Sequence, residues 1–119
     1  MKTSKNKIEP FITKDGSSVR ELIHPAFQEG AAMSFAEAIV RQGSSTMLHI
    51  HRKSQEIYHI TQGKGMMALG IERFEVKSGD SVLIMPGMPH CIENIGTQPL
   101  RILCCCHPPY DHQDTQILK

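Results

Sequence analysis

The chain has 119 residues, with 13 Lys and Arg against 12 Asp and Glu and a formal net charge of +1. This length predicts one domain built around one core. The basic residues are scattered after the first few positions, which argues against a nucleic-acid surface, and no apolar run follows the lysine-rich start, which argues against a signal peptide or a membrane span. We therefore expect a cytoplasmic protein that binds neither nucleic acid nor membrane.

Short apolar segments broken by Gly, Pro and Asn predict an antiparallel, all-β fold. In chain order we expect an N-terminal arm at residues 1–16, the folded domain at 17–110 and a C-terminal tail at 111–119. Both polar ends are expected to be mobile or to pack across a partner subunit. The expected strands cover residues 19–23, 33–41, 46–51, 56–61, 65–69, 74–77, 81–85, 90–94 and 100–106.

Two segments need a choice of structure. Residues 30–40 are rich in Ala, Glu and Met, which favour a helix by propensity alone. We predict a strand there because the segment leads into the strand of His49 and because closure of a barrel can override local preference. Gly70 lies between two apolar runs and adopts positive φ at little cost, so it predicts a hairpin.

The histidine pattern indicates a metal site. His49 and His51 are separated by one residue, so on a strand both side chains project from the same face. Glu56 follows after a tight turn, and His90 arrives from a distant strand. Three imidazoles and one carboxylate suit one divalent transition metal ion such as Fe, Mn, Ni, Cu or Zn. A closed structural zinc site and a histidine cluster without metal remain the alternatives.

Strand alternation also predicts which neighbours face the cavity. With Glu56 inward, Tyr58 and Ile60 point inward as well, and with His49 inward so does Met47. The Tyr58 hydroxyl could hydrogen-bond a substrate or a metal-bound water, which makes Tyr58 the candidate catalytic residue. The alternative is an aromatic ring that fills the barrel, with its hydroxyl on a polar neighbour.

The four cysteines do not form a chelating pattern, because no Cys-x-x-Cys pair occurs among Cys91, Cys104, Cys105 and Cys106. We interpret them as buried thiols in a reducing compartment. If Arg101 faces solvent, alternation turns Cys104 and Cys106 inward, where either thiol could line the cavity.

Two stretches carry a family resemblance. Residues 43–63 read G-x5-H-x-H-x4-E-x6-G, which resembles the first sequence motif of the cupins. Residues 79–94 are similar to the second motif, with the proline one place late at Pro86 and three positions in register, at Gly87, His90 and Asn94. The resemblance implies a single-domain double-stranded β-helix, or jelly-roll, barrel that holds a divalent metal at His49, His51, Glu56 and His90.

The resemblance extends to small stand-alone cupins described as mannose-6-phosphate isomerase-like, and it leaves two classes of function open. The first is a metal-dependent enzyme, an oxygenase or a sugar isomerase or epimerase, that acts on a small oxygenated molecule. The second is a non-catalytic small-molecule-binding protein or sensor with bound metal. The chain has no cluster of Arg and Lys for a phosphate, which argues against a phosphosugar. The apolar Ile50 and Ile57 are expected to face outward and, with the resemblance, predict a homodimer.

Overall fold

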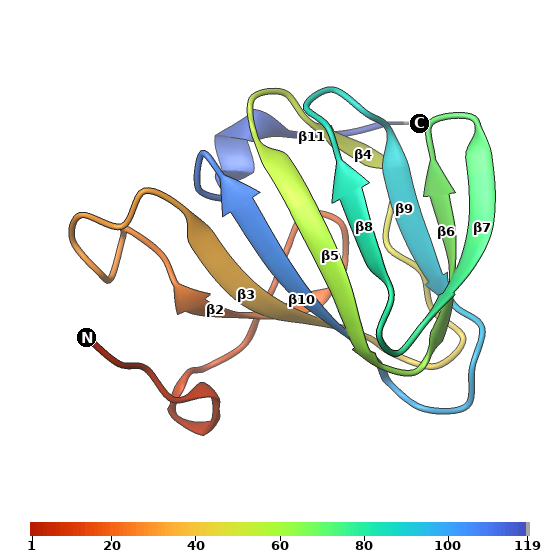
Figure 1. Cartoon of the computed structure of the whole chain (residues 1–119), viewed down its shortest axis with the longest axis horizontal. Coiled ribbons are helices and arrows are strands. Elements are labelled where there is room, and N and C mark those ends of the chain that lie inside the picture. Colours follow the sequence, from red (N-terminus) through yellow and green to blue (C-terminus); the bar gives the residue numbers. More distant parts are fainter. Residues whose placement is uncertain (119) are drawn as a thin grey trace.

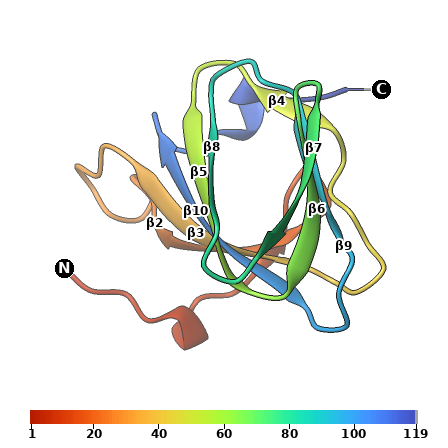
Figure 2. The ribbon, with the colours of Figure 1, turned by 45° about the vertical axis from the view of Figure 1, so that its right-hand side comes forward.

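The computed structural model describes residues 1–118, which form two antiparallel sheets that face each other around an apolar core. Figure 1 shows the strands in chain colours, and Figure 2 shows the sheets as the two walls of a barrel. The predicted all-β, single-domain jelly-roll fold is confirmed. Apart from two short 3-10 helices, η1 (Lys5–Lys7) and η2 (His112–Asp114), the regular elements of this part of the chain are strands.

The first sheet has six strands. Their order across the sheet is β1 (Phe11–Ile12), β2 (Ser18–Ile23), β3 (Ser34–Val40), β10 (Leu100–His107), β5 (Gln55–Gln62) and β8 (Ser81–Ile84). The second sheet has five strands in the order β11 (Thr115–Ile117), β4 (His49–His51), β9 (His90–Asn94), β6 (Lys64–Leu69) and β7 (Glu72–Lys77). Each strand predicted from the sequence is present, with ends shifted by a few residues.

Alternation along the strands separates a buried face from an exposed one. On β5, Tyr58 is 4% exposed and Ile60 is 0% exposed, whereas Ile57, which precedes Tyr58, is 46% exposed. The same period of two on the other strands fills the space between the sheets with apolar side chains. The largest of these are almost fully buried: Ile60, Met67, Ile84, Ile92, Leu100 and Ile102.

The strand predicted within residues 30–40 is confirmed as β3, although its residues favour a helix. The small side chains of Ala36 and Ala38 face the cavity, and β3 is paired on both sides, with β2 and β10. Pairing on two edges outweighs the helix propensity of isolated residues. The hairpin at Gly70 is also confirmed, since Leu69 pairs with Glu72 and the glycine has φ of 60°.

The C-terminal segment differs from the expected tail. Strand β11 pairs with β4 and so extends the second sheet, while η2 before it is capped by the Asp111 carboxylate, which accepts from the Gln113 N–H. Residue 119 of the expected tail lies outside the described residues. The expected N-terminal arm likewise contains β1, which pairs with β2. Within residues 1–118, no helix has the length and apolar character needed to cross a membrane.

Candidate metal centre

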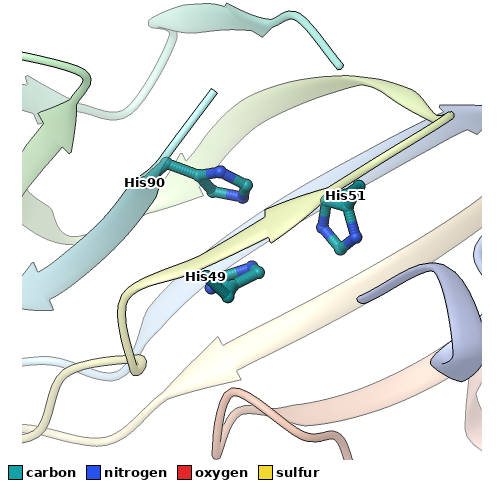
Figure 3. A group of neighbouring side chains, drawn as sticks. All are labelled: His49, His51 and His90. Carbon is teal, nitrogen blue, oxygen red and sulfur yellow. The ribbon is translucent and has the colours of Figure 1, made fainter. Parts of the chain in front are cut away.

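Strand pairing brings the three histidines together. His49 on β4 and His90 on β9 are direct cross-strand partners, and their ring centroids are 4.1 Å apart. His51, two residues along β4, lies on the same face, with ring centroids 5.1 Å from His49 and 5.3 Å from His90. One ring nitrogen of each histidine lies within 4.8 Å of the others. Figure 3 shows His49 and His51 on one strand and His90 on its neighbour.

Backbone carbonyls fix the protonation of two of these rings. The Nδ1–H of His49 donates to the Met47 carbonyl at 2.6 Å, and the Nδ1–H of His90 donates to the Met88 carbonyl at 2.9 Å. Because a neutral imidazole carries one ring proton, the Nε2 atom of each ring is left with a free lone pair. That lone pair is what a metal ion binds.

His51 is oriented by the C-terminal strand. The Thr115 hydroxyl donates to the Asp111 carbonyl at 3.0 Å, so its oxygen is free to accept from the His51 Nδ1–H, also at 3.0 Å. Thr115 is the register partner of His51 across β4 and β11. All three histidines therefore have their Nδ1 atoms occupied, and their Nε2 atoms remain available for a metal ion.

Glu56 approaches from the opposite sheet, on β5. Its Oε1 atom lies 3.2 Å from the His51 Nε2 and 3.7 Å from the His90 Nε2, while its Oε2 accepts from the Cys106 thiol at 3.3 Å. Cys106 is the register partner of Glu56 on β10.

The centre contains buried polar atoms that lack partners within the described part of the chain. Glu56 Oε1 and His90 Nε2 have no hydrogen-bond partner. Burial, assisted by the nearby His90, lowers the pKa of His49 to about 4, so this ring is neutral near pH 7. A carboxylate oxygen and an imidazole nitrogen that are buried side by side without hydrogen-bond partners suit a bound cation. The donor set fits a divalent transition metal ion, with His49, His51, Glu56 and His90 as the residues that could hold it.

His49, His51 and Glu56 border a cavity of about 40 Å³ between the two sheets. Tyr58, Cys104 and Cys106 line it, as alternation predicted, and no Lys or Arg of residues 1–118 is among the lining residues. Burial raises the pKa values of Tyr58, Cys104 and Cys106. These groups therefore keep their protons near neutral pH, and the thiols are poor metal ligands in that form.

Sequence reasoning misplaced one residue of the site and missed others. Met47 was expected to face inward, but it is 54% exposed, because β4 begins only at His49 and alternation does not extend back to Met47. Asp15, Glu21 and Tyr110 line the cavity although their segments showed no site pattern. Burial, opposed by His24 and reinforced by Glu56, raises the pKa of Glu21 to about 7. The only sequence signal for Asp15 was the turn-forming pair it makes with Gly16.

Comparisons with known proteins agree with this architecture. The profile described as Cupin domain matches residues 36–106. An uncharacterised protein of Methanocaldococcus jannaschii is 57% identical over 119 residues, which cover 100% of this chain and 95% of that protein. An oxalate-binding protein of Thermotoga maritima is 32% identical over 93 residues, which cover 76% of this chain and 77% of that protein.

Among solved structures, a predicted oxalate decarboxylase of Thermotoga maritima superposes with a TM-score of 0.79 and 28% sequence identity, covering 91% of this chain and 99% of that chain. The fold, the three clustered histidines and the match to the domain profile lead to the same assignment. The chain belongs to the cupin family.

Proposed function

We propose that the protein binds one divalent transition metal ion through His49, His51, Glu56 and His90 and uses it, as a metal-dependent enzyme, to bind and transform a small oxygenated molecule. The observation that carries this proposal is the pair of buried atoms without partners, Glu56 Oε1 and His90 Nε2. When bound, the metal would supply a Lewis-acid position for ligand oxygens. The protein's own part is to present unprotonated nitrogens on one side of the cavity and proton donors on the other.

The cavity supports a ligand about the size of oxalate. Its volume of about 40 Å³ corresponds to roughly three water molecules at ~10–15 Å³ each, which is small for a sugar phosphate. No Lys or Arg of the described residues lines it, so the positive charge that attracts an anion would come from the metal. The related oxalate-binding protein and predicted oxalate decarboxylase favour the same class of ligand. A mannose-6-phosphate isomerase-like function would use the same metal site, but the small cavity and the absence of Lys and Arg from its described lining argue against a sugar phosphate.

Tyr58 is the proposed catalytic residue. It lines the cavity beside the histidines, with its ring centroid 6.1 Å from that of His90. Burial, with the Glu56 charge nearby, raises the pKa of Tyr58, so its hydroxyl can donate a hydrogen bond to a ligand oxygen without ionising. Tyr58→Phe should therefore leave the metal in place and weaken ligand binding or turnover.

Metal analysis of purified protein tests the site. Wild type should contain about one metal ion per chain, and His49→Ala and Glu56→Ala should each contain much less, because both remove a ligand. His59→Ala is the matched control, since the His59 ring bonds the Ser81 hydroxyl instead of a member of the centre. Unchanged metal content in both ligand variants would contradict the assignment.

A ligand assay separates enzyme from binder. Titration calorimetry should detect oxalate binding to the manganese-loaded protein and none to the chelator-treated protein. The loaded protein should then be screened for oxygen consumption and product formation with oxalate, β-diketones, thiol acids and catechols. Turnover of one of them supports the enzyme, whereas binding without turnover supports the second candidate, a non-catalytic small-molecule-binding or sensor protein.

We also propose a homodimer. The exposed face of the first sheet carries a row of apolar side chains that are register neighbours across four strands: Phe35, Cys105, Ile57 and Leu83. Ile57 is 46% exposed and Leu83 is 51% exposed, whereas Ile50 is partly covered on β4 beside β11. A second copy of the same face would cover this row. Light scattering should give the dimer mass for wild type and the monomer mass for Ile57→Lys, and a wild-type monomer would contradict the proposal.

A further inference from the structure

We propose that Asp15 is a further protein ligand of the metal, a second carboxylate delivered by the turn between β1 and β2. This inference rests on the proposed function, because it requires that the centre binds a metal. It adds to the site a residue from the N-terminal segment, outside both of the motifs that carry the histidines and Glu56.

The Asp15 carboxylate lies beside the imidazole of His49. Asp15 Oδ2 lies 3.5 Å from the His49 Nε2, and the two side chains are 14% and 1% exposed. The His49 ring proton is on Nδ1, where it is donated to the Met47 carbonyl. A metal ion bound at the His49 Nε2 would lie within reach of the Asp15 Oδ2. The Asp15 carboxylate also lines the same cavity as His49, His51 and Glu56.

The turn holds the Asp15 carboxylate in a defined orientation. Its Oδ1 atom accepts three hydrogen bonds, from the Thr13 hydroxyl at 2.6 Å, the Ser17 N–H at 2.9 Å and the Ser17 hydroxyl at 2.7 Å. These bonds use one oxygen and leave Oδ2 directed at His49. The Met47 N–H also donates to the Asp15 carbonyl at 2.8 Å, which ties the turn to the segment that leads into β4. Such supporting bonds are what positions a metal ligand in advance.

A second carboxylate changes the character of the centre. Two carboxylates balance the charge of a divalent ion, and additional oxygen ligands favour manganese and iron over softer metals. Five protein ligands would leave one position of an octahedron for an oxygen of a bound molecule. The affinity for the metal and the geometry around it should therefore both depend on Asp15.

Cobalt titration of three proteins tests this inference. Asp15→Asn should weaken Co²⁺ binding by ~10–100-fold and alter the visible absorption of bound Co²⁺, because a carboxylate oxygen leaves its coordination shell. Glu21→Gln is the matched control: it replaces another carboxyl group that lines the same cavity, but the Glu21 carboxyl group lies 3.7 Å from His24 and has no such contact with the three clustered histidines. This variant should keep the wild-type spectrum and change the affinity by less than about threefold, as expected for a screened charge.

The outcomes separate the two proposals. A wild-type spectrum in Asp15→Asn, or an equal loss of affinity in both variants, would overturn the role of Asp15 while leaving the centre intact. Absence of Co²⁺ binding by wild type would instead overturn the proposed function. Asp15→Ala provides a second variant, since an asparagine carbonyl can itself bind a metal, and it should show the same spectral change with at least as large a loss of affinity.

Discussion

The two walls of the cavity differ in where their polar groups keep their protons. On the wall formed by β4 and β9, each histidine has its Nδ1 atom occupied, so the Nε2 atoms are free to bind a cation. On the wall formed by β2, β10 and β5, burial raises the pKa values of the acidic groups, and these keep their protons to higher pH: Glu21, Tyr58, Cys104 and Cys106. Under the proposed function, one wall would bind the metal and the other would donate hydrogen bonds to the molecule that the metal holds.

Glu56 lies on one wall of the cavity but contacts a histidine of the other. It belongs to β5 but reaches across to the other sheet, where its Oε1 lies 3.2 Å from the His51 Nε2. A charged carboxylate at the boundary gives the histidine wall the negative charge that a divalent ion requires. The predictions below test each wall in turn.

Replacement of a histidine at the centre of the first wall should have the largest effect. His90 is fully buried and has an unpartnered Nε2, so His90→Gln, which keeps a similar volume, should lose nearly all bound metal. Elemental analysis measures the metal, and circular dichroism confirms that the variant remains folded. Full retention of metal by a folded variant would show that the first wall does not bind it.

The second largest effect should come from removal of the metal, which should lower the free energy of unfolding. A ligand at a hundredfold excess over its dissociation constant stabilises the folded state by ~2.7 kcal/mol, so chelation should reduce the free energy of unfolding by about that amount. Urea denaturation with and without chelator measures the change. His90→Gln should show no response to the chelator, and an equal response in both proteins would point to metal bound elsewhere.

Loss of the hydrogen bond between His51 and Thr115 should have a smaller effect on metal binding. Thr115→Val removes the hydroxyl that accepts from the His51 Nδ1–H and should weaken metal binding by about tenfold, as expected for a group that orients a ligand. Competition with a chelating dye measures the affinity. Thr61→Val is the control, because Thr61 is exposed and its hydroxyl donates to the Arg101 carbonyl, away from the centre. Equal affinities of the two variants would remove Thr115 from the site.

The wall formed by β2, β10 and β5 should make the stability of the protein depend on pH. Burial raises the pKa of Glu21 from its ordinary 4.5 to about 7, so the folded protein binds more protons than the unfolded chain between these values. The tighter binding of this proton by the folded protein stabilises it fully below pH 4.5, and that stabilisation is lost as pH rises through 7. Without metal, Glu21→Gln should exceed wild type in unfolding free energy by ~1 kcal/mol at pH 8, with screening by solvent allowed for, and by less at low pH. Parallel stability profiles in urea denaturation would contradict this.

The sequence predicted the histidine wall better than the rest of the site. His49, His51 and Glu56 follow one another within a strand, a turn and a second strand, and local alternation sets their directions. His90 completes the pattern from a distant strand, and its place beside them depends on the pairing of β4 with β9. Thr115 and Asp15 depend instead on contacts between distant segments, such as the bond from Thr115 to His51 across 64 positions. No local pattern encodes such pairing, and a three-residue edge strand such as β11 has too few residues to show a period.

A crystal structure of the manganese-loaded protein, with anomalous scattering measured at the metal, tests the central claim most directly. We predict one anomalous peak within ~2.0–2.4 Å of the Nε2 atoms of His49, His51 and His90 and of a Glu56 carboxylate oxygen, the range for metal bonds to such atoms. A peak at another place, or metal-loading conditions that leave these four side chains without a shared ion, would contradict the account.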